Sequence, residues 1–275
     1  MSQQRSGSGS VAFTNVPVGT YNVKGSSVNH YTFNANGSLS VTGGQNTSHN
    51  VHYAFNNIPL EQCSWSEIDA IGQAGAASSV FSVGDTKNIS VSGETLTMEI
   101  YGFNHDDLTS GGKAPYTFGM KNLMASTRAM NSSRTNSGSF VGSAMYTGYL
   151  STSFLTGLPS DLQSVIKTVN KKTGTGGGSS SGTRTDAVKI FLFAEIEVFG
   201  SITKSVSGEG SRYSRFTNSS SRIKHLSNGS GSARWWWLRS PGSGDSNRFC
   251  GVDGSGDADW SYANSSDGVC AGFCV

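Results

Sequence analysis

The sequence has few charged residues, few cysteines and prolines, and no long hydrophobic run. Only 14% of its 275 residues are Asp, Glu, Lys or Arg, whereas an average globular protein has roughly 25%. The formal net charge is +2 and the basic residues are scattered, so we expect no nucleic-acid partner. No window approaches the roughly 18 apolar residues of a membrane-spanning helix, and we therefore expect no membrane insertion.

The sequence also lacks two marks of secreted proteins. Residues 1–7 contain no apolar segment that would form the centre of a signal peptide, so we see no signal peptide. Four cysteines, Cys63, Cys250, Cys270 and Cys274, are too sparse for a disulfide scaffold in a chain of this length. We expect free, mostly buried thiols, with a pairing of Cys250 to one of the last two cysteines as the alternative.

Glycine, in contrast, is abundant. It accounts for 36 of the 275 residues, about twice its usual share of roughly 7%. This composition favours turns and long loops. The length is sufficient for one large domain or two modest ones with a buried core.

Residues 9–55 alternate apolar and polar side chains in short runs, which is typical of strands. The apolar positions are Val11, Phe13, Tyr21, Val23, Tyr31, Phe33, Leu39, Val41, Val51, Tyr53 and Phe55. Asn36-Gly37 separates two of these runs and indicates a β-hairpin. The segment 15–23 also resembles the turn and strand of immunoglobulin-like or prealbumin-like modules of surface and phage-fibre proteins. We predict a small antiparallel β module over 1–57, used for attachment or as a spacer.

Two helices are predicted in a second domain over residues 58–275. Apolar residues recur at three- and four-residue spacing across 61–80, and Ser64 with Glu67 fits a capping box at the start of this helix. A second apolar stripe predicts a helix over 159–169, capped by Ser160 or Asp161.

Strands and loops are expected between and after these helices. The patterns predict strands over 81–85 and 89–102, and the apolar run 190–194 suits a central strand. Residues 174–182 are expected to form a flexible glycine and serine loop. Helices among short strands and long loops indicate an α+β fold.

The sequence contains no arrangement of residues typical of catalysis, and we expect a protein that is not an enzyme. None of the five histidines has nucleophile-elbow or zinc-protease spacing. His105-Asp106-Asp107 is the densest titratable cluster. A metal or acid–base site is one interpretation, and we favour a turn whose carboxylates cap backbone amides.

A calcium site is the alternative to our prediction that no cofactor is bound. Asp253, Asp257 and Asp259 lie at alternate positions of a polar run, as do the first oxygen ligands of a calcium loop. The sixth and twelfth positions lack the glycine and the glutamate of such a loop. Alternate polar residues on an exposed edge explain the pattern more simply, and the cysteines lack zinc-site spacing.

The most informative segment is 234–241, which contains three consecutive tryptophans. Three adjacent side chains cannot share one face of a strand or a helix, so at least one must be anchored in a core. We favour buried packing over a carbohydrate-stacking platform. The residues that follow, up to Val275, are almost entirely small or polar. This contrast indicates a rigid base that carries a recognition surface.

Several motifs, in order along the chain, resemble a domain family of unknown function from gut bacteria and their phages. They are Phe81–Lys87, Gly102–Asp107, Leu158–Lys167, Glu195–Gly200, Glu209–Tyr213, Trp236–Gly242 with the letters WWLRSP, and Gly268–Val275. The resemblance spans roughly residues 58–275. Members of this family resemble C-type lectin-like domains, the fold of formylglycine-generating enzymes and of variable proteins of diversity-generating retroelements.

In such variable proteins a C-terminal cassette is rewritten at adenines, so that AAY codons become NNY codons. The resemblance implies a variable C-terminal region over 235–275, and residues 243–267 draw heavily on the amino acids that NNY codons encode. Trp260 is an exception, since no NNY codon encodes tryptophan. We expect 235–241 to belong to the fixed scaffold. The expected fixed packing positions are Phe249, Val252, Val269 and Phe273.

We therefore predict a diversified, non-enzymatic ligand-binding protein of a phage tail or a bacterial surface. Its partner would be a host-surface protein or glycan, and a homo-oligomer, a trimer by analogy, is expected. The predicted ligand-binding surface is Ser243, Asp245, Ser246, Asn247, Arg248, Gly251, Asp253, Asp257, Asp259, Trp260, Ser261, Tyr262, Asn264 and Asp267. Arg248, Trp260 and Tyr262 are the expected anchors, because a few such residues carry most of the affinity of an interface.

Two other functions remain open at this point. One is a calcium-dependent, carbohydrate-binding lectin that uses Asp253, Asp257 and Asp259. The other is an enzyme of the formylglycine-generating type, which needs a reactive thiol pair, and Cys270 with Cys274 is the only close pair in the sequence.

Overall fold

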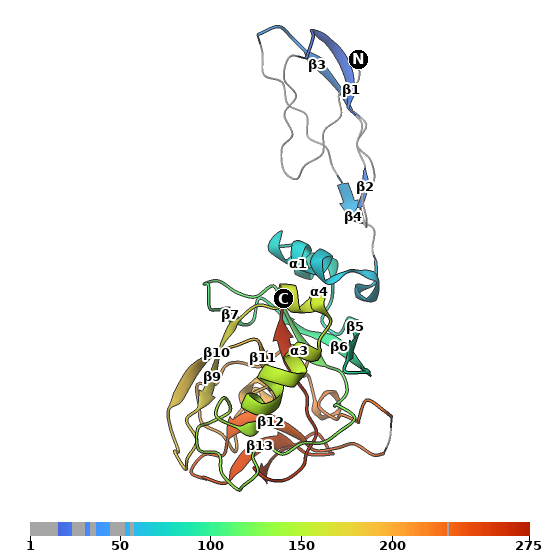
Figure 1. The fold of residues 1–275 in the computed structure, drawn as a ribbon. Helices are drawn as coiled ribbons and strands as arrows, with labels where there is room; N and C mark the ends of the chain where they lie inside the picture. Colours follow the sequence, from blue (N-terminus) through green and yellow to red (C-terminus); the bar gives the residue numbers. More distant parts are fainter. Residues whose placement is uncertain (1–15, 24–30, 34–36, 45–52, 56–57, 230) are drawn as a thin grey trace. The chain divides into compact units, whose positions relative to one another are not determined.

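The computed structural model describes residues 16–23, 31–33, 37–44, 53–55, 58–229 and 231–275 (Figure 1). The chain divides into two compact units, Met1–Ile58 and Pro59–Val275. This division lies one residue from the predicted domain boundary between 57 and 58.

The described part of the first unit consists of four short strands. Strand β1 (Gly19–Val23) pairs antiparallel with β3 (Gly37–Val41), and β2 (Tyr31–Phe33) pairs antiparallel with β4 (Tyr53–Phe55). The predicted hairpin across Asn36-Gly37 is wrong, because β3 pairs with β1 and not with β2. Short alternating strands specify their partner and register only weakly. The predicted strand positions Val11, Phe13 and Val51, and Asn36 itself, lie outside the described residues.

The second unit begins with short helices, η1 (Leu60–Gln62), α1 (Trp65–Gln73) and α2 (Ala77–Val80). The Ser64 hydroxyl accepts the Glu67 N–H at 3.3 Å, and the Glu67 carboxylate accepts the Ser64 N–H at 2.8 Å, which confirms the predicted capping box. The single helix predicted over 61–80 is divided. Gly75 has a φ of 71°, and this left-handed conformation ends α1.

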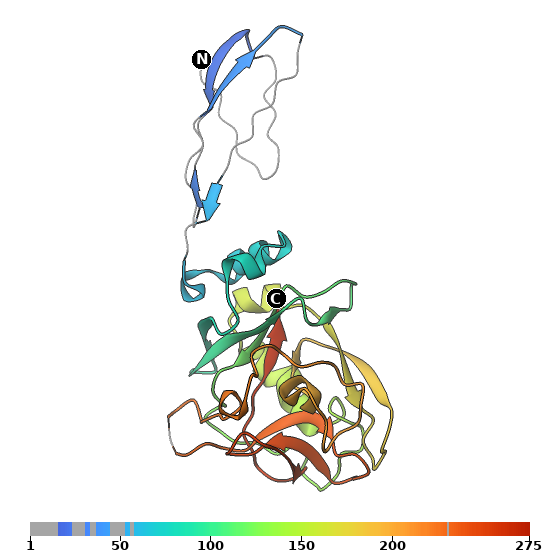
Figure 2. The ribbon, with the colours of Figure 1, turned by 180° about the vertical axis from the view of Figure 1, so that it is seen from behind.

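A five-stranded antiparallel sheet forms the core of the second unit (Figures 1 and 2). Its order is β11 (Ile190–Phe191), β15 (Gly272–Cys274), β8 (Tyr116–Met120), β6 (Glu94–Phe103) and β5 (Thr86–Val91). All five residues of β8 are buried. Residues 272–274 thus lie among strands formed by residues 86–120.

Three strand predictions differ from this sheet. Residues 81–85 form a turn region before β5, and the strand predicted over 89–102 is divided into β5 and β6. Ser92 and Gly93, with φ of 50° and 86°, form the tight turn that joins the two strands. Strand β11 has two residues and lies at the edge of the sheet. The apolar run 190–194 therefore reflects burial in the core and not a central position.

The remaining helices and a smaller sheet surround this core. The helices are the π-helix η2 (Tyr146–Phe154), α3 (Leu155–Gly157), α4 (Ser160–Val165), α5 (Glu195–Phe199) and the 3-10 helix η3 (Ser219–Ser221). The smaller sheet has the order β10 (Thr183–Val188), β9 (Val169–Gly174) and β7 (Asp107–Leu108). The predicted glycine and serine loop connects β9 to β10.

The helix predicted over 159–169 is shorter than expected. It ends at Val165, because the chain turns into β9 at Val169. Pro159 occupies the N-cap position, and neither Ser160 nor Asp161 provides the predicted cap.

The third sheet carries the region of functional interest. It consists of β12 (Trp236–Pro241), β13 (Arg248–Val252) and β14 (Ala258–Tyr262), which are antiparallel neighbours in this order. The three sheets of the second unit, together with several short helices, agree with the predicted α+β class. Strand β14 lies at the edge of its sheet, and all five of its residues are partly exposed.

Candidate functional site

The base of the site is formed by the tryptophan-rich strand β12. Trp236 and Trp237 are fully buried, which confirms that at least one of the three tryptophans is anchored in a core. The Trp236 indole N–H donates to the Arg222 carbonyl at 3.0 Å, and the Trp237 indole N–H donates to the Arg128 carbonyl at 2.7 Å. Both polar groups are therefore satisfied inside the protein, as buried indoles require.

Arg239, in the same strand, is also fully buried and is paired with Glu197 of α5. Its Nη2 donates to Glu197 at 2.9 Å, and its Nη1 donates to the other oxygen of the same carboxylate. Three peptide carbonyls accept its remaining N–H groups, those of Leu192, Lys172 and Glu209. Bidentate pairs of this kind fix geometry strongly. Strand β12 is thereby joined to α5 and β9.

The ion pairs continue from Glu197 to Lys171 and Asp106. Lys171 Nζ lies 2.8 Å from Glu197 and 2.6 Å from Asp106, and the Tyr213 hydroxyl donates to Asp106 at 2.8 Å. Burial alone would raise the pKa of Asp106, but Lys171 and hydrogen bonds hold this pKa well below its usual value. Burial opposes ionisation of Glu197 in the same way, and Arg239 and Lys171 lower its pKa. Asp106 thus belongs to a buried ionic network, and our interpretation of it as a cap of turn amides is wrong.

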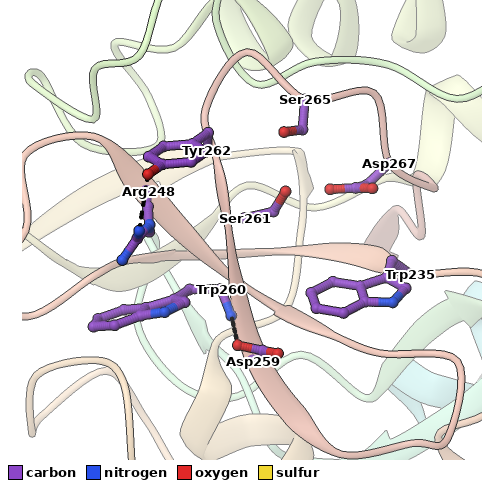
Figure 3. A pocket seen from close by; sticks show the side chains of 8 residues that line it. All are labelled: Trp235, Arg248, Asp259, Trp260, Ser261, Tyr262, Ser265 and Asp267. Atoms are coloured by element: carbon purple, nitrogen blue, oxygen red, sulfur yellow. Dashed lines mark hydrogen bonds between the residues drawn. The ribbon is translucent and has the colours of Figure 1, made fainter.

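A pocket of about 480 Å³ opens on this base (Figure 3). It is lined by Trp235, Arg248, Asp259, Trp260, Ser261, Tyr262, Ser265 and Asp267. Most of these residues belong to β13, β14 and the segment that follows β14. Figure 3 shows that the side chains lie on both sides of β14, which follows from the alternation of side chains along a strand.

On one side of β14, Arg248 lies between two aromatic rings. Its guanidinium carbon is 4.6 Å from the Tyr262 ring centroid and 5.1 Å from the Trp260 ring centroid. Its Nη2 donates to the Tyr262 hydroxyl at 3.0 Å, and its Nη1 is 3.5 Å from Asp245. The strand register explains the arrangement, since Arg248 is directly opposite Tyr262 and Trp260 precedes Tyr262 by two residues.

On the other side of β14, Trp235 faces a group of polar side chains (Figure 3). Asp259, Ser261 and Asp267 surround the indole, which is 36% exposed. Burial raises the pKa of Asp267 despite a hydrogen bond with Ser261. The Asp267 Oδ2 is buried and accepts no hydrogen bond within the described part of the chain. The pocket therefore joins a cationic half with an acidic half.

The predicted surface residues are distributed unequally over this site. Arg248, Asp259, Trp260, Ser261, Tyr262 and Asp267 line the pocket. Ser246, Asn247, Asp257 and Asn264 are exposed without lining it, and Ser243, Asp245 and Asp253 are half-buried around it. The prediction that Gly251 belongs to the ligand-binding surface is wrong. Gly251 is buried, and a Cβ there would lie 3.0 Å from the Trp236 carbonyl oxygen. It has no surface to offer a ligand.

Sequence reasoning missed two lining residues, Trp235 and Ser265. Trp235 was expected in the fixed scaffold together with its two neighbours. Trp235 precedes β12 and is 36% exposed, whereas Trp237, two residues further along, is fully buried, so alternation within the triplet gave no signal for the position of Trp235. The expected packing positions Phe249, Val252, Val269 and Phe273 are all fully buried.

Two carboxylates, Asp253 in the β13–β14 turn and Asp259 in β14, accept backbone N–H groups. One Asp253 oxygen accepts the N–H groups of Ser255 and Asp257 at 2.8 and 2.9 Å, and Asp259 accepts the N–H of Trp260 at 2.8 Å. Among the residues that the structure describes, no group of three or more His, Cys, Asp or Glu side chains is placed to hold a metal ion.

The four cysteines are free and buried, as expected. Cys270 lies beside the Tyr101 hydroxyl and Cys274 lies beside Asp106, so the two thiols have different surroundings. Burial raises the pKa of both thiols, most strongly that of Cys274. Neither thiol reaches the pocket.

The fold and the pocket define an α+β domain that presents aromatic and charged side chains on a buried base. The chain belongs to the family described as Domain of unknown function (DUF6273), whose model matches residues 116–275. A family of unknown function was expected, over roughly 58–275. No curated protein and no solved structure matches the chain. None of the described helices is long and apolar enough to cross a membrane.

Proposed function

We propose that this protein is a non-enzymatic receptor-binding protein of a phage tail or a bacterial surface. Residues 243–267 would vary between relatives through a diversity-generating retroelement, on a C-type lectin-like domain over 58–275. The observation that carries the proposal is the composition of the pocket. Seven of its eight lining residues lie within 243–267, and Trp235 is the eighth.

The separation between base and surface supports this proposal. Phe249 and Val252 of β13 are fully buried, whereas Arg248, Trp260 and Tyr262 are only partly buried. Exchange of exposed residues usually changes stability by no more than about 0.5 kcal/mol. Such a surface tolerates many side-chain sets, because the tryptophans and the ionic network below it hold the fold.

The chemistry of the pocket suits binding. Arginine, tryptophan and tyrosine are the residue types that dominate interface hot spots, and all three gather here. The Asp253 carboxylate accepts two backbone N–H groups of the β13–β14 turn, and the proposed binding involves no metal ion. A homo-oligomer would add avidity to several such pockets.

Binding to host surfaces tests the proposal. The full chain is titrated onto a panel of intact gut bacteria, and Trp260→Ala and Tyr262→Ala are compared with the wild type. We expect each variant to weaken binding at least tenfold. Tyr149→Ala is the matched control, because Arg128 stacks on this ring at 3.7 Å outside the pocket. The proposal is wrong if no surface is bound, or if the pocket variants bind as tightly as the control.

A further inference from the structure

The cation–aromatic contacts around Arg248 extend beyond the pocket on both sides. Lys204 Nζ lies 4.9 Å from the Trp260 ring centroid, and the Arg134 guanidinium lies 4.0 Å from the Tyr262 ring centroid. Together the residues form a cation–aromatic ladder in the order Lys204, Trp260, Arg248, Tyr262 and Arg134. Lys204 and Arg134 lie outside residues 243–267, so they belong to the proposed fixed part of the protein.

The backbone of the segment that carries Lys204 is held in place. The buried carboxylate of Glu195 accepts the N–H groups of Thr203, Lys204 and Ser205. The Lys204 carbonyl accepts the N–H of Ser243 at 2.8 Å. These bonds fix the backbone of Lys204, from which the side chain extends to Trp260.

The segment that carries Arg134 is joined to the site in a similar way. Asn131 donates its backbone N–H to the Ala263 carbonyl at 2.8 Å, and Asn136 donates its backbone N–H to the Ser246 carbonyl at 2.8 Å. These bonds flank Arg134 on both sides in sequence. Its guanidinium is held against Tyr262 by a segment that is hydrogen-bonded to the ends of β13 and β14.

The ladder carries three positive charges with little compensation. Neither Lys204 nor Arg134 forms an ion pair with a carboxylate in the described part of the chain, and Arg248 is 3.5 Å from Asp245. The ring contacts place neighbouring cations at most about 10 Å apart, close to the Debye length of ~8 Å at physiological ionic strength. The positive potentials of the three cations therefore reinforce one another at the surface of the ladder. The N–H donors of Arg134 remain available for a carboxylate, phosphate or sulfate group.

The acidic half of the pocket limits which anionic ligands can bind to the whole site. Asp259 and Asp267 lie beside Trp235, so a ligand that carries only negative charge would be repelled there. A sugar ring has hydroxyl groups that donate to carboxylates, and it has an apolar C–H face that packs on an exposed indole. An acidic sugar combines these features with one anionic group for the ladder.

From this arrangement we propose that the site recognises acidic glycans: the ladder binds the carboxylate, phosphate or sulfate groups, and Trp235 with Asp259 and Asp267 binds the neighbouring sugar ring. The inference rests on the proposed function and names the ligand class of the same site. Lys204 and Arg134 lie outside 243–267, so these two cations of the ladder remain when that region varies, whereas Arg248, Asp259 and Asp267 belong to the region that would vary.

Three matched pairs of polysaccharides test this inference with the full chain. They are polygalacturonate and its methyl ester, dextran sulfate and dextran, and phosphocellulose and cellulose. We expect at least tenfold tighter binding to the acidic member of at least one pair, and this preference decreases as salt is added. Poly-L-glutamate is included as an acidic peptide.

Two charge-matched double variants identify the binding surface. Lys204→Gln with Arg134→Gln should abolish the preference for the acidic polysaccharide. Lys87→Gln with Lys113→Gln removes the same charge beside β5 and β7, which lie away from β13 in Figure 1, and should retain the preference. Thermal midpoints of both double variants show whether the fold is retained.

Three results would overturn the inference: equal binding within every pair, a preference that survives loss of Lys204 and Arg134, or tightest binding to poly-L-glutamate. The last result would assign the ladder to acidic peptides. If bacteria are bound through Trp260 without any preference for acidic glycans, the proposed function stands and only this inference is wrong. If no bacterial surface is bound, the proposed function is wrong.

Discussion

Replacement of Arg239 by methionine removes a fully buried guanidinium and keeps an unbranched apolar side chain that reaches about as far as Nε. The change takes away both donors that Arg239 directs at the Glu197 carboxylate. The carbonyls of Leu192, Lys172 and Glu209 lose the same guanidinium. Lys171 remains 2.8 Å from Glu197, so the carboxylate keeps one cation.

Removal of one partner from a buried ion pair costs about 3–5 kcal/mol. We expect a loss in this range, since Lys171 still pairs with Glu197 but three carbonyls lose their hydrogen bonds to the guanidinium. For a protein of this size 1 kcal/mol corresponds to roughly 2–4 °C in Tm. The variant should therefore unfold roughly 6–20 °C below the wild type.

Urea unfolding at pH 7, followed by tryptophan fluorescence, measures the loss directly. Arg184→Met is the control, because Arg184 pairs with Asp186 at the surface and is 43% exposed. It should cost less than about 1 kcal/mol. Arg239→Met with Glu197→Gln should recover part of the stability, because Lys171 then balances the single remaining carboxylate, Asp106, and not two carboxylates. If Arg239→Met costs no more than Arg184→Met, our account of the buried network is wrong.

Four further predictions concern stability, thiol reactivity and metal dependence. Asp106 and Glu197 have lowered pKa values in the folded protein, so their contribution to stability is complete above the usual carboxyl pKa of about 4 and is lost as the pH falls below that value. Urea midpoints measured from pH 7 to pH 3 test this loss, and midpoints that stay constant would contradict it. Gly119→Ala should destabilise strongly because its Cβ would overlap the buried Tyr101 ring, whereas Gly148→Ala, with open space around its Cβ, should leave Tm unchanged or higher. The four buried thiols should react with a thiol reagent only after denaturation, and rapid labelling of the native protein would refute their burial. A chelator should leave the proposed binding unchanged, and loss of binding in EDTA would favour the calcium-dependent lectin.

Features that depend on neighbouring residues were predictable from the sequence. The capping box of Ser64 and Glu67 requires only a three-residue spacing, and it is present as predicted. The alternation of side chains along a strand predicted that at least one of the three tryptophans is buried, and Trp236 and Trp237 both are. In each case the interacting groups are close in sequence, so the local pattern contains the information.

Features that depend on distant partners were not predictable in this way. Asp106 resembled a turn residue because its partners Lys171 and Tyr213 are 65 and 107 residues away. The ladder was missed for the same reason, since Lys204 and Arg134 come from separate loops that meet only at β14. Their sequence neighbourhoods contain no signal of this proximity.

The central position of β15 has a consequence for the order of folding. This strand, from residues 272–274, pairs with β8 on one side and with β11 on the other. Before β15 pairs with β8, the N–H and C=O groups along one edge of β8 have no strand partner. Exposed edges of this kind promote aggregation. Pairing over about 150 residues also closes a long loop, which slows folding. We therefore expect refolding to be slow, and fragments that lack residues 236–275 to aggregate instead of forming a smaller stable domain.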